Sequence, residues 1–292
     1  MKKTKYATAT AFRRALEDRL KNIEEKEKTG LPRLRRQVAF DRLLARLFLG
    51  ENSPWVLKGG YAMELRMANS RATRDIDLIL KKKIAGSPNN AEQNNIILGL
   101  LREKADADLS DFFVYRIETA SIDLTNAPYG GGRFPVIARM DGRTFAKFHL
   151  DVGLGDVVLE PLEVISGRDW LGFAGISPPR LTALSKEQQF AEKLHAYTTR
   201  RERTNSRVRD LVDMVLLIDS GELSGVATLK AIQRTFGRRK THSIPENLPQ
   251  PPENWRTPFV VLAEQCQLPT DISRSFAKVG NFYSNLLKKD RG

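Results

Sequence analysis

Cysteine is almost absent from this sequence: Cys266 is the only one among 292 residues. No intramolecular disulfide can form, which excludes a small scaffold held together by disulfides. A lone cysteine most often behaves as a small buried apolar side chain, and we expect this of Cys266. We therefore expect a protein without a disulfide partner that works in the reducing cytoplasm.

Long hydrophobic runs are also missing. No apolar segment approaches the roughly 18–20 residues needed to span a bilayer, so we expect no membrane partner. The basic N-terminus has no apolar stretch before Asp18 and Arg19, which argues against a signal peptide. With 41% hydrophobic and 28% charged residues, the composition is typical of a globular protein and excludes collagen-like or wholly disordered chains.

Acidic residues are scarce relative to basic ones: 48 Lys and Arg stand against 35 Asp and Glu, a net charge of +13. Such an excess favours a polyanionic partner, most often nucleic acid, although acidic proteins and membrane surfaces also bind basic proteins. Basic residues concentrate over 186–209 and 230–240. Each stretch is either a solvated helical face or part of an RNA-binding track. No RRM, KH or zinc-knuckle signature is present, so recognition by shape and phosphates, as of a folded tRNA, is expected.

Hydrophobic periodicity predicts two domains, a mixed α/β part over residues 1–165 and a mostly helical part over residues 166–292. In the first part we expect helices over 8–28, 32–49 and 96–109, strands over 55–58, 76–80, 112–122, 135–140 and 145–159, a loop over 83–95 and a glycine-rich turn over 129–133. In the second part we expect helices over 184–200, 208–221, 224–237, 258–267 and 271–288, with a proline-rich linker over 245–255.

Two acids on a predicted strand carry the strongest chemical signal. Asp75 and Asp77 flank the apolar Ile76, so the period of two places both carboxylates on one face, about 6 to 7 Å apart. Like charges this close are costly unless a cation lies between them, and two divalent ions in such a place can clamp a phosphoryl displacement. A solvated strand with two unrelated acids would give the same pattern.

Two neighbouring motifs favour the metal hypothesis. Gly59 and Gly60 follow a predicted strand and begin a helix, where bare backbone N–H groups can approach a phosphate. Asp151 lies between Leu150 and Val152 on a later strand and can project a third carboxylate toward the same place. The alternative for Asp151 is an acid at a strand edge or turn.

The order of these motifs resembles a known superfamily. A double glycine, a helix, a strand with Asp-apolar-Asp and a third acid on a later strand are the pattern of DNA polymerase β-like nucleotidyltransferases. More specifically, LKGGYAMELR, RATRDIDL, HLDVGLGD, FAEKLHAYTTR and RVRDLVDMVLL, spread over residues 57–217, resemble the AbiEii nucleotidyltransferase toxins of type IV toxin–antitoxin systems, which include the mycobacterial MenT proteins. The implied fold is an α/β (α+β) nucleotidyltransferase core with a mostly helical C-terminal lobe.

The resemblance implies roles for individual residues. Asp75, Asp77 and Asp151 would hold catalytic Mg²⁺ or Mn²⁺, and Asp151 would take the proton of the attacking hydroxyl. Gly59 and Gly60, together with Lys58, would cradle the triphosphate of the NTP substrate. Lys193 matches a family lysine that contacts nucleotide phosphates, and Asp210 matches a family acid at the active site.

Several neighbours of these motifs have open roles. Thr73 stands where MenT-like toxins carry a Ser or Thr that the antitoxin can phosphorylate, which would add about two negative charges beside the acids. Arg71 could bind a phosphate or neutralise the acids, and Lys58 is an uncertain phosphate ligand because the loop before Asp75 is long. Asp210 and Asp213 share a helical side and could instead pair with Arg207 or Arg209. His195 points away from Lys193 and is expected to be either structural or at the surface.

The family resemblance implies a reaction and a partner. The expected activity is transfer of a nucleoside monophosphate from an NTP to an RNA 3′ hydroxyl, with tRNA as the expected acceptor, which would block translation and require a cognate antitoxin of the AbiEi-like type. One alternative is transfer of AMP or UMP to a protein hydroxyl. Another is a non-catalytic module that binds RNA or nucleotides.

Overall fold

A computed structural model describes residues 5–81, 84, 89–124, 127–200 and 207–290. Contacts between residues divide the chain into two compact units. The first unit comprises Met1–Leu65, Ala72–Gly155 and Val164–Ala183, and the second comprises Arg66–Arg71, Asp156–Glu163 and Leu184–Gly292. The predicted division into domains over residues 1–165 and 166–292 stays a prediction.

One mixed sheet forms the centre of the first unit. Its described strands follow the order β3-β5-β6-β2-β1-β8-β7, and β4 pairs with β5. The strands are β1 (Trp55–Lys58), β2 (Asp75–Leu80), β3 (Val114–Ile117), β4 (Ile122–Asp123), β5 (Gly131–Met140), β6 (Arg143–Leu154), β7 (Glu163–Ser166) and β8 (Arg180–Ala183). In the middle of the sheet, β2 runs parallel to β6 and antiparallel to β1, and β6 runs antiparallel to β5.

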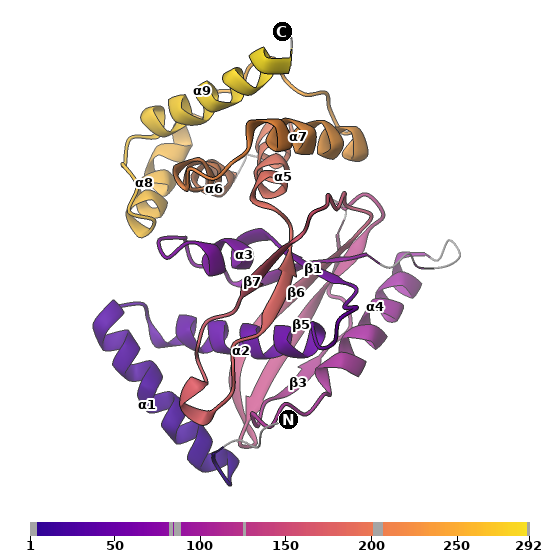
Figure 1. Ribbon diagram of the computed structural model, residues 1–292, viewed down its shortest axis with the longest axis vertical. Coiled ribbons are helices and arrows are strands. Elements are labelled where there is room, and N and C mark those ends of the chain that lie inside the picture. Colours follow the sequence, from indigo (N-terminus) through magenta and orange to yellow (C-terminus); the bar gives the residue numbers. More distant parts are fainter. Residues whose placement is uncertain (1–4, 82–83, 85–88, 125–126, 201–206, 291–292) are drawn as a thin grey trace. The chain divides into compact units, whose positions relative to one another are not determined.

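Helices cover one face of this sheet (Figure 1). The helices that begin in the first unit are α1 (Ala9–Glu27), α2 (Leu31–Leu47), α3 (Gly59–Arg66) and α4 (Asn90–Ala105), with the 3-10 turn η1 (Gly172–Ala174). Helix α2 packs on β6, α4 packs on β3 and β5, and α1 packs on α2. Ile76, Leu78, Leu150 and Val152 of the two central strands are completely buried in this core. Because side chains alternate along a strand, the acids between them point to the other face.

The second unit is helical in its described part. Its helices are α5 (Lys186–Thr198), α6 (Val208–Asp219), α7 (Gly225–Arg239), α8 (Arg256–Gln265) and α9 (Ile272–Asp290), with the 3-10 turn η2 (Glu253–Trp255). Ser185 and Ser224 cap α5 and α7 by accepting hydrogen bonds from backbone N–H groups of the first turn. Helix α5 packs on α6 and α7, and α6 packs on α8 and α9. The mixed α/β fold with a mostly helical C-terminal part is confirmed.

Burial and helix length agree with two expectations. Cys266 is fully buried, so its expected role as an apolar side chain is confirmed. Among the helices of residues 5–81, 84, 89–124, 127–200 and 207–290, none has the length and apolarity required to cross a bilayer.

Two predicted boundaries were wrong for identifiable reasons. Helix α4 begins at Asn90, inside the predicted 83–95 loop and before the predicted start at residue 96, because Asn89 and Glu92 form a reciprocal capping box. The predicted glycine turn over 129–133 is largely strand, because β5 begins at Gly131 and pairs there with Gly153. A Cβ on Gly131 would lie 2.1 Å from the carbonyl oxygen of Val152, so this close pairing requires glycine.

Candidate active site

Four charged residues form a row across four adjacent strands of the first unit. Lys58 on β1 lies opposite Asp77 on β2, Asp77 lies opposite Asp151 on β6, and Asp151 lies opposite Arg133 on β5. Residues that oppose each other in neighbouring strands project from the same face. The sheet thus places two central carboxylates between two outer cations, an arrangement we call the charged row.

The third acid, Asp75, projects from the same face one pleat away, and we count it as part of the charged row. It is separated from Asp77 by the buried Ile76 and lies opposite His149 of β6. The Nδ1 atom of His149 is 3.2 Å from a carboxylate oxygen of Asp75. Asp75, Asp77 and Asp151 are therefore brought to one face of adjacent strands, as their alternation with apolar residues predicts.

Arg133 forms the strongest contacts described within the row. Its Nε–H and one NH₂ group donate to the two carboxylate oxygens of Asp151 at 2.8 Å each, and that NH₂ group is 3.5 Å from Asp75. The hydrogen bonds to Asp151 raise the pKa of Arg133 above its ordinary value. Sequence reasoning missed this arginine and His149, because only the cross-strand register brings them to the acids.

Gly59 is required by its contact with Asp77. Its φ is +68°, and a Cβ at this position would lie 2.1 Å from a carboxylate oxygen of Asp77. Helix α3 begins here with Gly59 and Gly60, so the start of a helix lies directly beside an acid of the row. The glycine pair thus allows the backbone to approach the acidic face more closely than any other residue type would.

The donor set suits a divalent cation. Carboxylate oxygens are the ligands that Mg²⁺ prefers, and Asp75, Asp77 and Asp151 offer them on one face. Within the described ranges, no three His, Cys, Asp or Glu side chains converge closely enough to be identified as a metal site. Arg133 supplies positive charge to Asp151 and Asp75 in this conformation.

The remaining predicted site residues lie in the second unit and form a cluster of their own. The Nζ atom of Lys193 on α5 is 2.7 Å from Asp213 and 3.3 Å from Asp210, both on α6. Arg71 donates two hydrogen bonds to the carboxylate of Asp213, at 2.9 and 2.8 Å. Arg207 also lies 3.4 Å from Asp210. Arg71 thus pairs with Asp213, and its two predicted roles, binding a phosphate or neutralising the acid pair, stay predictions.

Burial makes these pairs electrostatically strong. Burial alone would raise the pKa of Asp213, but Lys193 and Arg71 hold it below its ordinary value. Burial would lower the pKa of Lys193, but Asp213 and Asp210 raise it above its ordinary value. Lys193 therefore stays a cation fixed between two acids.

His195 has the structural role expected of it. It is 3% exposed, its Nε2 lies 2.9 Å from the hydroxyl of Thr241, and its ring packs edge-on against Phe236. Burial lowers the pKa of His195 to about 3, so the ring is neutral at physiological pH.

Thr73 lies just before the acid pair. Its backbone N–H donates to the buried Glu64, and its hydroxyl donates to the carbonyl of Asp75 at 3.4 Å. The side chain is half-buried, within reach of the acidic face.

Some basic residues of the stretches 186–209 and 230–240 form ion pairs within the second unit. Lys186 pairs with Glu222, and Arg239 pairs with Asp156 at 2.9 Å. On α7, Lys230, Arg234 and Arg238 are exposed and recur at intervals of four, which aligns them on one side of the helix. Residues 201–206 of the first stretch lie outside the described part.

Comparisons with known proteins agree with this geometry. The sequence profile of the family described as "Nucleotidyl transferase AbiEii toxin, Type IV TA system" matches residues 42–277. A search of curated protein sequences finds no match. Among solved structures, the chain is similar to MenT4, a nucleotidyltransferase toxin from Mycobacterium tuberculosis, with a TM-score of 0.57 and 17% identity over 88% of this chain and 85% of that chain. JHP933 from Helicobacter pylori also matches, with a TM-score of 0.48 and 17% identity over 88% of this chain and 92% of the other.

The profile match covers all five motifs and most of both units, and the similarity to MenT4 shows a shared fold. A family of this kind uses an NTP and a divalent metal, and its toxins are matched by a cognate antitoxin. The chain therefore belongs to the AbiEii family and is a nucleotidyltransferase toxin of a type IV toxin–antitoxin system.

Proposed function

We propose that this toxin transfers a nucleoside monophosphate from an NTP to the 3′ hydroxyl of an RNA, with tRNA as the acceptor, and thereby blocks translation. The observation that carries the proposal is the charged row, in which Asp77 and Asp151 lie opposite each other with Asp75 one pleat away. Phosphoryl transfer depends mainly on positioning and on charge stabilisation, which metal ions held by several carboxylates on rigid strands would provide.

Asp75, Asp77 and Asp151 are the proposed ligands of Mg²⁺ or Mn²⁺. When bound, the ions supply charge stabilisation for the displacement at phosphorus. Lys58 and the backbone of Gly59 and Gly60 lie beside Asp77 and are the proposed contacts of the triphosphate. From the family resemblance, Lys193 and Asp210 are proposed as further contacts of the nucleotide site.

Asp151 is the proposed acceptor of the proton of the attacking hydroxyl. Its carboxylate is bound by Arg133 at both oxygens, which fixes its orientation. Each carboxylate oxygen has two lone pairs, so Asp151 can accept a proton while both hydrogen bonds from Arg133 stay in place.

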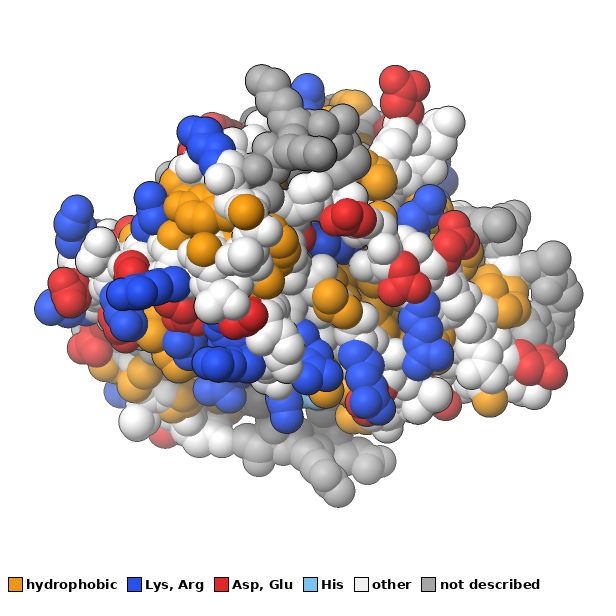
Figure 2. All heavy atoms as spheres, turned by 90° about the horizontal axis from the view of Figure 1, so that it is seen from below, with side chains coloured by type: hydrophobic (Ala, Val, Ile, Leu, Met, Phe, Trp, Pro, Cys, Tyr) orange, Lys and Arg blue, Asp and Glu red, His pale blue; other side chains and the backbone are white. Residues whose placement is uncertain are grey.

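The distribution of charge supports an RNA acceptor. The net charge of +13 and the aligned Lys230, Arg234 and Arg238 of α7 favour contact with phosphates. On the face drawn in Figure 2, Lys and Arg side chains form a broken band with acidic side chains among them. Such a surface fits recognition of a folded RNA by shape and phosphates.

Control by the antitoxin is proposed to act at Thr73. A phosphate on its hydroxyl would put about two negative charges next to Asp75 and disfavour entry of a nucleotide. Incubation with the cognate antitoxin and ATP should phosphorylate the wild type and leave Thr73→Ala unmodified. Equal phosphorylation of both proteins would exclude Thr73 as the site.

The proposed reaction is tested by incubating the purified protein with Mg²⁺, total tRNA and each α-labelled NTP in turn. Label should appear on tRNA with one preferred nucleotide and be absent with Asp75→Ala/Asp77→Ala. Glu118→Gln removes an exposed carboxylate at the end of β3 and should transfer label like the wild type.

Other patterns of label would overturn this proposal. Label confined to protein bands would establish transfer to a protein hydroxyl instead. Bound tRNA without label under any of the four nucleotides would indicate a module that binds RNA without modifying it. Toxicity that survives the loss of both acids cannot come from metal-dependent transfer.

A further inference from the structure

Three arginines gather at the Asp75 end of the charged row, all within the first unit. Arg33 and Arg36 are one helical turn apart on α2 and therefore share a side of that helix. Arg74 directly precedes Asp75 and is exposed. We call Arg33, Arg36 and Arg74 the arginine cluster.

Glu64 of α3 ties this cluster together. Its buried carboxylate lies 3.6 Å from Arg33 and accepts hydrogen bonds from the side chain of Gln37 and from the backbone N–H of Thr73, the neighbour of Arg74. Glu64 thus fixes the first turns of α2 against the segment that carries Arg74. Arg33 and Arg36 lie on a helix, and Arg74 ends the loop before β2, next to Thr73, whose backbone Glu64 holds.

Positive charge in the cluster exceeds the negative charge available to it. Arg33 and Arg36 both interact with one buried carboxylate, Glu64, and Asp75, which also attracts Arg36, is in contact with Arg133 and His149. Burial, followed by repulsion from Arg74, lowers the pKa of Arg36 below its ordinary value. The Nε–H groups of Arg33 and Arg36 are buried and donate to no group in the described part of the chain. Unpaired buried donors and crowded cations are costly, and an anion would relieve both.

We infer that the arginine cluster is a binding subsite for a backbone phosphate of the acceptor RNA. This inference rests on the proposed nucleotidyl transfer and specifies where its acceptor enters. Planar guanidinium groups match the geometry of a phosphate, which they bind with two parallel hydrogen bonds.

The position of the cluster favours the acceptor over the NTP. Lys58 and Gly59 lie at the Asp77 end of the acid pair and are the proposed triphosphate contacts, whereas Arg74 adjoins Asp75. In an in-line displacement, the attacking and leaving oxygens lie on opposite sides of the phosphorus. Cations at both ends of the acid pair suit two separate phosphate-bearing substrates.

The test measures binding of fluorescently labelled total tRNA to Arg36→Gln and Arg74→Gln by anisotropy, without NTP and over a range of salt concentrations. Each substitution should raise the Kd about three- to tenfold, as expected for a charge-assisted contact. The slope of log K against log salt should become shallower by about one. Arg36→Lys keeps the charge without the planar fork and should fall between Arg36→Gln and the wild type.

Arg35→Gln is the matched control. Arg35 lies on the same helix but is bound by two hydrogen-bonding groups to Glu17, with the shortest contact 2.7 Å, so the variant removes the same charge outside the cluster. Its tRNA affinity should stay within twofold of the wild type. Equal weakening by Arg35→Gln and Arg74→Gln would show a non-specific effect of net charge and overturn the inference.

NTP binding, followed by protection against thermal unfolding, separates the two phosphate sources. If NTP protects both cluster variants as well as it protects the wild type, the result supports an RNA subsite. If a cluster variant loses this protection but binds tRNA normally, the cluster binds the NTP and the inference is overturned. The tRNA-binding measurement does not depend on turnover. If the wild type binds tRNA through the cluster but transfers no label, the proposed reaction is wrong and the phosphate subsite still stands. Arg74 is exposed, so its variant keeps the test valid if Arg36→Gln unfolds.

Discussion

The first unit contains two clusters of aspartate and arginine that differ in burial and in charge balance. In the charged row, the side chains of Asp75 and Arg133 are 30% and 32% exposed. Around Asp111, the carboxylate is completely buried between Arg42 and Arg46, at 2.7 and 2.6 Å. The acids of the charged row are thus partly exposed and accessible to a ligand, whereas Asp111 is enclosed by its two arginine partners.

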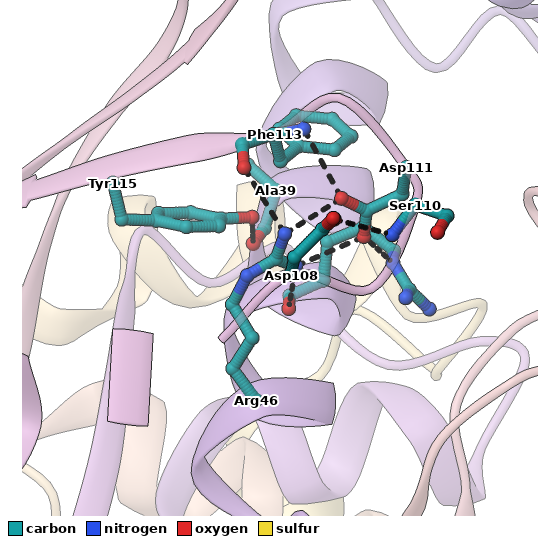
Figure 3. Close-up of polar contacts among 8 residues, drawn as sticks. Ala39, Arg46, Asp108, Ser110, Asp111, Phe113 and Tyr115 are labelled. Atoms are coloured by element: carbon teal, nitrogen blue, oxygen red, sulfur yellow. Dashed lines mark hydrogen bonds and ion pairs between the residues drawn. The ribbon is translucent and has the colours of Figure 1, made fainter. Parts of the chain in front are cut away.

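The Asp111 cluster is built for stability (Figure 3). Arg46 donates to both oxygens of Asp111 and to the carbonyl of Phe113, whose own N–H donates to the same carboxylate. The guanidinium also lies 5.3 Å from the centre of the Tyr115 ring. This network ties α2 to the start of β3, and it leaves the carboxylate no access to a substrate.

The largest expected effect is on catalysis. Asp75→Asn/Asp77→Asn should lower nucleotidyl transfer by at least about 10³-fold, because it removes the charge that the proposed metal ions require. The melting temperature should stay the same or rise, since two neighbouring like charges are removed. Transfer rates and thermal unfolding measured on the same preparation test both statements. If the double variant unfolds, these two acids are required for the stability of the fold, as we expect of Asp111.

Asp111→Asn should have the opposite profile. Breaking a buried ion pair leaves two arginines without their counter-charge and should lower the free energy of unfolding by about 3–5 kcal/mol. Transfer activity per folded molecule should stay within a few-fold of the wild type. Denaturant unfolding together with activity below the transition gives the measurement. Lost activity in a fully folded Asp111→Asn protein would break the distinction between the two clusters.

Another buried acid of the first unit, Asp41, extends the comparison to pH. The hydroxyl of Tyr61 and the backbone N–H of Arg168 donate to it, yet burial raises its pKa to about 6. Because the folded-state pKa is raised, its contribution to stability is fully present below the unfolded value near 3.8 and is lost as the pH rises through about 6.

Asp41→Asn, which cannot ionise, therefore provides the reference. The free energy of unfolding of the wild type relative to Asp41→Asn should fall by about 2 kcal/mol between pH 4 and pH 7. Urea unfolding of both proteins at intervals of half a pH unit measures this difference. A difference that stayed constant over this window would show that Asp41 is ionised throughout.

The sequence predicts the acids of the charged row much better than their partners. Asp75, Asp77 and Asp151 alternate with apolar residues on strands, and this local pattern fixes the face on which they lie. Arg133 and His149 reach the same face only through the register of β5, β6 and β2. Register depends on the packing of whole strands, so no local sequence motif predicts that either residue belongs to the site.

The same limit applies to the second unit. Asp213 receives Lys193 from α5 and Arg71 from a segment more than a hundred residues away in sequence, whereas helical spacing alone suggested pairs with nearby arginines. Likewise, the first turns of α4 depend on a cap at Asn89 within a stretch whose composition is typical of a loop. Composition and periodicity predict elements and faces, and the long-range ion pairs follow only from the assembled fold.

Arg133→Gln has the smallest expected effect, and it tests directly how the cations of the charged row influence metal binding. Arg133 occupies both oxygens of Asp151, so its loss should tighten binding of Mn²⁺ about three- to tenfold in the absence of nucleotide. Electron paramagnetic resonance of free Mn²⁺ measures this affinity without turnover. Arg139→Gln is the control, since Arg139 lies on the same strand and donates to the carbonyl of Gly142. Tighter binding in Arg133→Gln alone would identify this arginine as a competitor of the metal, whereas weaker binding would mean that it orients Asp151 for coordination.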